Sequence, residues 1–183
     1  MKKIEIEIPE GKRAEWVNGV LTLVDEKPQD ITERIKTFED ACDVLGEEHA
    51  LVTQYRLTAA TFKDDPTTRD LIAYLKLRII TTALNEGWKP TFDEDELRYY
   101  VWFYIYSKSE YGKLDEDIKG KHRVRLRSLN VANAYGGLVC ASAVYAGSYS
   151  NTGNGVQLAL RTKELAEYCG NQFIDIWADF LFK

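Results

Sequence analysis

Alternating apolar and polar residues dominate the first part of the chain. The alternation runs from Ile4 to Ile8, and it is typical of a strand with one apolar face. Residues 15–24 then read EWVNGVLTLV, in which Asn18-Gly19 has the composition of a two-residue hairpin turn. We therefore expect a strand pair within residues 1–27, semi-detached from the rest of a single domain that covers residues 1–183.

Helical spacing of apolar residues replaces this alternation in the next part of the chain. Residues 31–45 predict a first helix, preceded by a capping-box pattern and followed by Gly46 as its C-terminal cap. A second helix is expected over residues 50–62. A third helix begins near residue 67 and is stopped by Gly87. The apolar residues that share one face of this third helix are Leu71, Leu75, Ile79 and Ala83.

The second half of the chain returns to strand-like patterns. Residues 98–106 read RYYVWFYIY, and a run that is apolar on both faces is typical of a central strand covered on both sides. Residues 123–127, 138–145 and 156–160 are expected to complete the sheet, and Thr162 to cap a final helix. The order of these elements predicts an α+β fold with an N-terminal β-hairpin, a helical middle, an antiparallel sheet and a C-terminal helix.

The composition is that of an ordinary globular protein. Of the 183 residues, 45% are hydrophobic and 29% are charged. The net charge of −5 disfavours nucleic acid and anionic membranes as partners of the surface as a whole. No apolar run approaches the roughly 20 residues that span a bilayer, and the N-terminus lacks the apolar core of a signal peptide. We therefore expect no membrane partner, and a location in the cytoplasm or in a phage particle.

Residues that commonly carry catalysis are scattered along the chain. The two histidines, His49 and His122, have no nucleophile at a characteristic spacing. The three cysteines lie too far apart for a zinc site, and each has the apolar neighbours of a buried thiol. The glycine-rich segments lack the spacing of a phosphate loop. We predict no catalytic residue, no metal site and no cofactor, while the many carboxylates and tyrosines leave open an acid–base site that only the fold would assemble. The cysteines are Cys42, Cys140 and Cys169.

The stretch from residue 128 to residue 154 has the composition of a recognition surface. Tyr supplies rigid contact area in such surfaces, and Ser and Asn supply adaptable hydrogen bonds. We interpret this stretch as the ligand-binding region of a non-enzymatic protein whose partner is a protein or a glycan. The residues that we expect to make the contacts are Tyr135, Tyr145, Tyr149, Asn130 and Asn133.

A basic stripe supports an alternative function. Arg123, Arg125 and Arg127 alternate with apolar residues, so a strand would place them all on one face. Lys121 extends the stripe, and the aromatic strand offers rings on which bases can stack. The alternative is an accessory nucleic-acid-binding protein, whose affinity would fall steeply as the salt concentration rises.

Five segments together resemble a known group of proteins. They are residues 31–41, 83–90, 102–103, 155–162 and 164–173, and they include the sequences ALNEGWKP and GVQLALRT. Over nearly the whole chain after the strand pair, the sequence resembles a family of small uncharacterised proteins from gut bacteria and their phages or mobile elements. The resemblance implies a phage or mobile-element setting. It implies no activity, cofactor or site residue.

A second similarity concerns the end of C-type-lectin-like variable domains. Arg127-Ser128, the run that starts at Asn130, and residues 155–160 are similar to the RGGSW, Asn-rich and GFRLA segments of those domains. This chain departs from them because it lacks the Gly-Gly-Ser-Trp core and has Gln157 at the position of an Arg. The similarity implies that this region displays residues for ligand binding.

Overall fold

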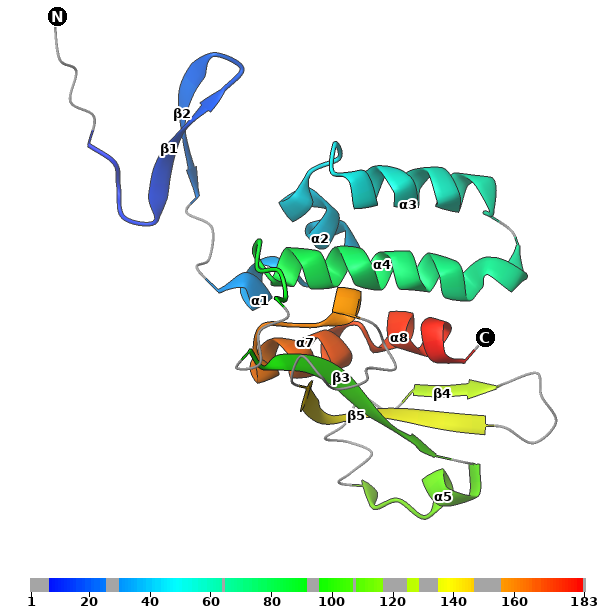
Figure 1. Cartoon of the computed structure of the whole chain (residues 1–183). Helices are drawn as coiled ribbons and strands as arrows, with labels where there is room; N and C mark the ends of the chain where they lie inside the picture. Colours follow the sequence, from blue (N-terminus) through cyan, green and yellow to red (C-terminus); the bar gives the residue numbers. More distant parts are fainter. Residues whose placement is uncertain are drawn as a thin grey trace, which may run out of the picture.

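The structure is a computed structural model, and it describes most of the chain. Within the described residues, a strand pair is followed by helices, a sheet and further helices, which confirms the predicted α+β fold. Figure 1 shows that the elements beyond the strand pair are stacked in layers around one long helix. The described residues are 7–25, 30–63, 65–91, 96–106, 108–116, 125–128, 135–146 and 156–182.

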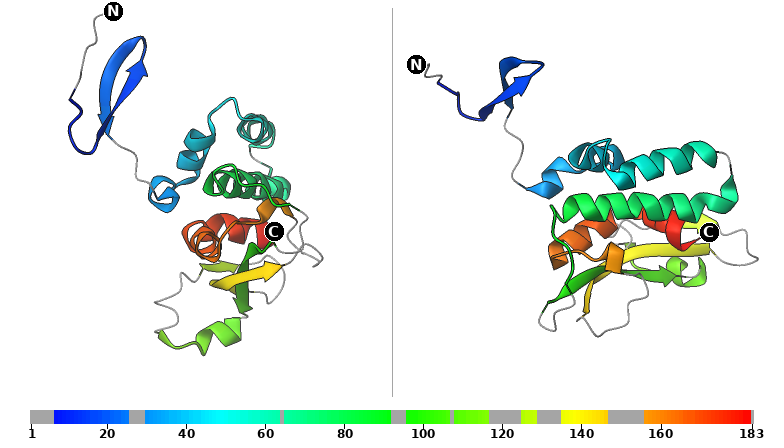
Figure 2. Two further views of the ribbon diagram at one scale, coloured as in Figure 1. Left: turned by 60° about the vertical axis from the view of Figure 1, so that its left-hand side comes forward. Right: turned by 45° about the horizontal axis from the view of Figure 1, so that its top comes forward.

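The N-terminal hairpin consists of β1 (Lys12–Val17) and β2 (Val20–Asp25), which pair antiparallel. Asn18 and Gly19 join the strands with φ angles of 52° and 80°. These are left-handed conformations, which a two-residue hairpin turn requires and which Asn and Gly adopt most readily. The predicted Asn-Gly turn is therefore confirmed. Figures 1 and 2 show the hairpin standing apart from the other elements.

The first predicted helix is broken into two helices, α1 (Ile31–Arg34) and α2 (Phe38–Leu45). The break occurs because Thr37 and Asp40 form a complete capping box that starts a new helix. The Thr37 hydroxyl accepts from the Asp40 N–H at 3.1 Å, and the Asp40 carboxylate accepts from the Thr37 N–H at 2.7 Å. The prediction of one continuous helix is therefore wrong, since this local cap satisfies the backbone groups that a longer helix would have paired internally.

The second and third predicted helices are confirmed as α3 (Ala50–Thr61) and α4 (Arg69–Leu84). A short 3-10 turn, η1 (Pro66–Thr68), precedes α4. α4 packs against α2 and α3 on one side and against the C-terminal helix α8 (Ile174–Leu181) on the other. The helix is therefore buried over more than one face, and the predicted buried face is wrong at Leu71, which is 43% exposed. Buried α4 residues outside that face include Leu77, Ile80 and Leu84.

The C-terminal helix begins at the predicted residue but is interrupted once. Thr162 caps α7 (Lys163–Gln172), because its hydroxyl accepts from the Leu165 N–H at 3.2 Å. The chain leaves the helical conformation at Phe173, with φ of −111° and ψ of 29°, and continues as α8. The single predicted helix is thus two helices, and both pack between α4 and the sheet.

The sheet has the strand order β3 (Arg98–Tyr106), β5 (Tyr135–Ala146) and β4 (Arg125–Ser128), with both neighbouring pairs antiparallel. α7 packs against β3 and β5 on one side of the sheet. β3 is therefore an edge strand of the described sheet, and its prediction as a central strand is wrong. Placement in the sheet was decided by the pairing partners of β3, which its own composition does not specify.

Residues 156–160 do not form the predicted strand. A 3-10 turn, η2 (Val156–Leu158), occupies most of the segment, and Leu160 alone makes an isolated bridge to β3. A polar side chain of α4 binds the backbone of this segment, since the Thr81 hydroxyl donates to the Gln157 carbonyl at 3.2 Å. Side chains from a helix thus satisfy groups that a neighbouring strand would otherwise pair.

The hydrophobic core is continuous from the helices to the inner side of the sheet. Its largest fully buried side chain is Trp177 of α8, which is 1% exposed. The Trp177 ring lies 5.5 Å from the ring centroid of Phe103 in β3 and 6.1 Å from that of Phe180. These distances are in the range of favourable aromatic pairs, so Trp177 links α8 to the sheet.

Candidate functional site

The predicted recognition surface falls only partly on described residues. Tyr135 and Tyr145 lie near opposite ends of β5, where they pair with Ser128 and Tyr99. The rise of an antiparallel strand separates two positions ten residues apart by roughly 30 Å, so one small ligand cannot span both. Three further predicted contact residues lie outside the described residues. They are Tyr149, Asn130 and Asn133.

The basic stripe of the alternative interpretation is described at two of its positions. Arg125 and Arg127 lie on β4, which is an edge of the described sheet. Their spacing of two residues places both positions on the same side of the strand. Arg123 and Lys121 lie outside the described residues.

The aromatic strand β3 has one covered face and one face that is covered only at its start. Tyr100 and Val101 are buried and Phe103 packs against the core, whereas Trp102 is 49% and Tyr104 is 55% exposed. The prediction that both faces are covered is therefore wrong from Trp102 on. The exposed side offers aromatic rings at a sheet surface, which is a common composition for a binding surface.

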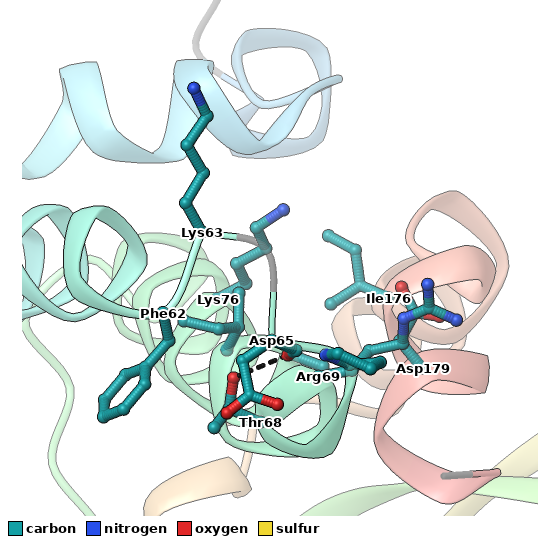
Figure 3. Close-up of a pocket in the computed structure, with 11 residues that line it drawn as sticks. Phe62, Lys63, Asp65, Thr68, Arg69, Lys76, Ile176 and Asp179 are labelled. Atoms are coloured by element: carbon teal, nitrogen blue, oxygen red, sulfur yellow. Dashed lines mark hydrogen bonds between the residues drawn. The ribbon is translucent and has the colours of Figure 1, made fainter.

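A hollow of about 450 Å³ lies between the end of α3, η1, the start of α4, and α8. Figure 3 shows that its walls combine the apolar side chains of Phe62 and Ile176 with charged ones. Lys63 extends away from the other lining side chains in this view. The lining therefore mixes apolar contact with charges of both signs.

One charged side chain of this hollow, Lys76, lies against aromatic rings. The Lys76 ammonium lies 5.3 Å from the ring centroid of Phe38 and 5.8 Å from that of Tyr55, so it is engaged by aromatic faces. The described lining residues include no His and no Cys, and hence no pair in which a His or a Cys acts as base or nucleophile. The hollow therefore offers a surface of mixed apolar and charged character for contact.

The C-terminal end of α4 connects three segments that lie far apart in the sequence. Asn85 is 6% exposed, and its Nδ2 donates to the Ala159 carbonyl at 2.9 Å while its Oδ1 accepts from the Arg161 N–H at 3.1 Å. The adjacent Glu86 carboxylate binds the Arg161 guanidinium at 2.5 Å and also that of Arg34 in α1. These contacts connect α1, α4 and the segment before α7. Asn85, Glu86 and Arg161 therefore have a structural role.

Cys42 and Cys169 are both buried, as the sequence predicted. Burial raises the pKa of the Cys42 thiol from 9.0 to about 11, and the negative charge of the nearby Glu39 adds to the rise. The thiol is thus protonated at neutral pH. A protonated, buried thiol is a poor nucleophile, so Cys42 belongs to the core.

This raised pKa predicts an alkaline loss of stability. Below pH 9 the thiol is neutral in the folded and unfolded states, and its contribution is fully present. As the pH rises from 9.0 towards about 11, the unfolded state loses the proton first, which favours unfolding. Urea unfolding at pH 8, 9 and 10 is expected to show the wild type losing stability relative to Cys42→Ala, on the order of 1 kcal/mol by pH 10. Parallel pH profiles for the two proteins would contradict this assignment.

His49 is engaged in a helix cap. Its Nδ1 accepts from the Leu51 N–H at 3.3 Å at the start of α3. Among the residues that the structure describes, no group of three or more His, Cys, Asp and Glu side chains could hold a metal ion. None of the helices in the described ranges has both the length and the apolar character needed to cross a bilayer.

Comparisons with protein-family models, with curated proteins and with solved structures find no match to this chain.

One face of the hairpin is apolar and exposed. The register pairs Trp16 with Leu21 and Ala14 with Leu23, so these four residues share one side, here called the hairpin face. Trp16 is 71% exposed, and Leu21 and Leu23 are 39% and 42% exposed. The other side carries the Arg13–Glu15 ion pair at 2.9 Å, together with Val17 and Val20, which are 43% and 63% exposed. The hairpin face is therefore the side that carries the aromatic ring and both leucines, and it is exposed to solvent.

The hairpin was predicted from the sequence, but no function was assigned to it. The signal was present, because apolar residues alternate on both sides of the Asn-Gly turn and align across it in a two-residue hairpin. What the sequence did not indicate is that this side would remain uncovered. In a larger sheet the same pattern would have marked a buried face.

Proposed function

We propose that this protein is a non-enzymatic partner-binding protein of a phage or mobile element, and that the hairpin face contacts the partner. The observation that carries the proposal is the exposure of Trp16, 71%, beside the leucines of the hairpin face, in a hairpin that packs mainly on itself. Exposed Trp side chains surrounded by aliphatic ones are typical of the centre of a protein interface.

The physical chemistry of the hairpin supports contact with another macromolecule. A two-stranded sheet alone is marginally stable in water, and it gains stability when its apolar face is covered. The core formed by α4, α7, α8 and the sheet contains no residue of the hairpin face. A partner that covers Trp16 and its neighbours would therefore bury apolar area without disturbing the rest of the molecule.

Two described residues of types that often carry catalysis have structural roles. The Cys42 thiol is held protonated in the core, and His49 caps a helix. These roles leave recognition as the function that the described geometry supports best.

Site-specific photo-cross-linking tests the proposal. A photoreactive amino acid placed at position 16 is expected to form adducts with other proteins in cells of the natural host. The same amino acid at position 15 is the matched control, because Glu15 lies on the same strand and the opposite side. Equal adducts from both positions, or none from position 16, would refute the assignment of the hairpin face.

A further inference from the structure

We propose that the outer edge of β2 pairs with the same edge of a second copy of this chain, which gives an antiparallel four-stranded sheet. The inference rests on the proposed function, because both assign the hairpin to contact between chains. It concerns the edge of the hairpin, however, and the proposed function concerns its apolar face. The partner at this edge is therefore this chain's own strand of residues 20–24.

The two outer edges of the hairpin differ in charge. In β1, Lys12, Arg13 and Glu15 carry charges, and charged side chains discourage a further strand from pairing at that edge. In β2, residues 20–24 read VLTLV, which contains no charge, no Pro and no Gly, and is rich in β-branched residues. Within the described residues β2 pairs with β1 alone. β2 therefore presents the open edge of the hairpin.

The sequence of this edge is a palindrome. When two copies of VLTLV run antiparallel about a two-fold axis at Thr22, Val20 of one copy lies opposite Val24 of the other, and Leu21 lies opposite Leu23. Thr22 lies opposite its own counterpart on the axis. Aliphatic pairs and a Thr–Thr pair are favourable across strands, and a two-fold interface requires such self-complementarity.

The alternation of hydrogen-bonded pairs along the hairpin also fits a two-fold axis at Thr22. A two-residue turn makes Val17 and Val20 a hydrogen-bonded pair, and such pairs alternate along an antiparallel ladder. The backbone N–H and C=O groups of Leu21 and Leu23 are therefore directed towards the free edge. A two-fold axis at Thr22 brings these groups opposite each other, so that each copy donates to and accepts from the other.

Pairing of the two edges also strengthens the hairpin itself. Three or more strands with an apolar face are needed for independent stability, and the dimer supplies four. Leu21 and Leu23 of both copies would meet at the centre of one sheet side, with Trp16 on either flank. The two hairpin faces then form one larger apolar surface for the partner of the proposed function.

Sedimentation velocity of the full chain, from low to high micromolar concentration, tests this dimer. The wild type is expected to form dimers. Thr22→Lys is expected to weaken dimerisation by about tenfold or more, because two ammonium groups meet at the axis. Inside one hairpin the new Lys lies opposite Glu15 in the register, so the hairpin itself is retained. Val17→Lys adds the same charge to β1 and is the matched control, which is expected to dimerise like the wild type.

A variant with the opposite charge at the axis separates loss of dimerisation from loss of folding, because only folded chains can form a heterodimer. Like Thr22→Lys, the double variant Glu15→Lys with Thr22→Glu places opposite charges across the hairpin. It differs from Thr22→Lys in the sign of the charge at the two-fold axis. It is expected to be monomeric alone and to form heterodimers when mixed with Thr22→Lys. A wild type that stays monomeric throughout, or a dimer that Thr22→Lys leaves intact, overturns the inference. Either result leaves the proposed function standing, since cross-linking from position 16 tests that separately.

Discussion

Replacing Trp177 with Ala is expected to lower the free energy of unfolding by about 3–5 kcal/mol. The side chain is 1% exposed and packs against Phe103 of β3 and Phe180 of α8. Its removal leaves a cavity between α8 and the sheet, which the surrounding helices can fill only in part. Urea unfolding followed by far-ultraviolet circular dichroism measures the loss, provided that the transition is two-state.

Two other variants show whether burial causes this effect. Trp177→Phe keeps most of the ring volume and is expected to cost only about 1–2 kcal/mol. The indole N–H that it removes has no hydrogen-bond partner among the described residues, so no hydrogen bond is lost with it. Trp16→Ala removes a 71% exposed ring and is expected to leave the main unfolding transition unchanged. Similar losses for Trp177→Ala and Trp16→Ala would contradict the described core.

Replacing Asn85 with Ala is expected to cost about 2–4 kcal/mol, because two buried backbone groups lose their partners. The amide nitrogen binds the Ala159 carbonyl at 2.9 Å, and the amide oxygen binds the Arg161 N–H at 3.1 Å. No water can readily replace a side chain that is only 6% exposed. The same unfolding measurement gives the loss, and hydrogen exchange of the Arg161 amide should accelerate.

Asn171 offers a matched control for this prediction. Among the described residues its side chain bonds only within its own helix, where its Nδ2 donates to the Glu167 carbonyl at 2.9 Å, and it is half-buried. Asn171→Ala is expected to change stability by less than about 1 kcal/mol and to leave exchange at Arg161 unaltered. An Asn85→Ala protein as stable as Asn171→Ala would mean that the bridge from α4 to the 156–162 segment contributes nothing.

Local sequence signals predicted those elements whose ends are set by nearby residues. The Asn18-Gly19 turn, the Thr162 cap and the bounds of α3 and α4 agree with the structure. In each case the determining interaction spans a few residues, such as a left-handed turn or a cap hydrogen bond. Such interactions act in the same way whatever the rest of the fold does.

Predictions that depended on distant partners were less accurate. The aromatic residues of β3 indicated a strand covered on both sides, yet Trp102 and Tyr104 are about half exposed. The segment 156–160 has strand-like composition, yet it is held by Asn85 and Thr81 of a helix region far away in sequence. Composition does not encode which element arrives beside a strand, so these assignments required the packed structure.

The sequence by itself determined the class of fold, the turn of the hairpin and most helix positions, because short-range capping and periodicity specify them. Only the tertiary structure decided which apolar faces are covered. The same alternation that marks Val101 as core leaves Trp16 exposed, because helices pack over β3 and no helix of the described part of the chain packs over the hairpin face. Burial depends on what lies opposite a residue, and that is a property of the whole fold.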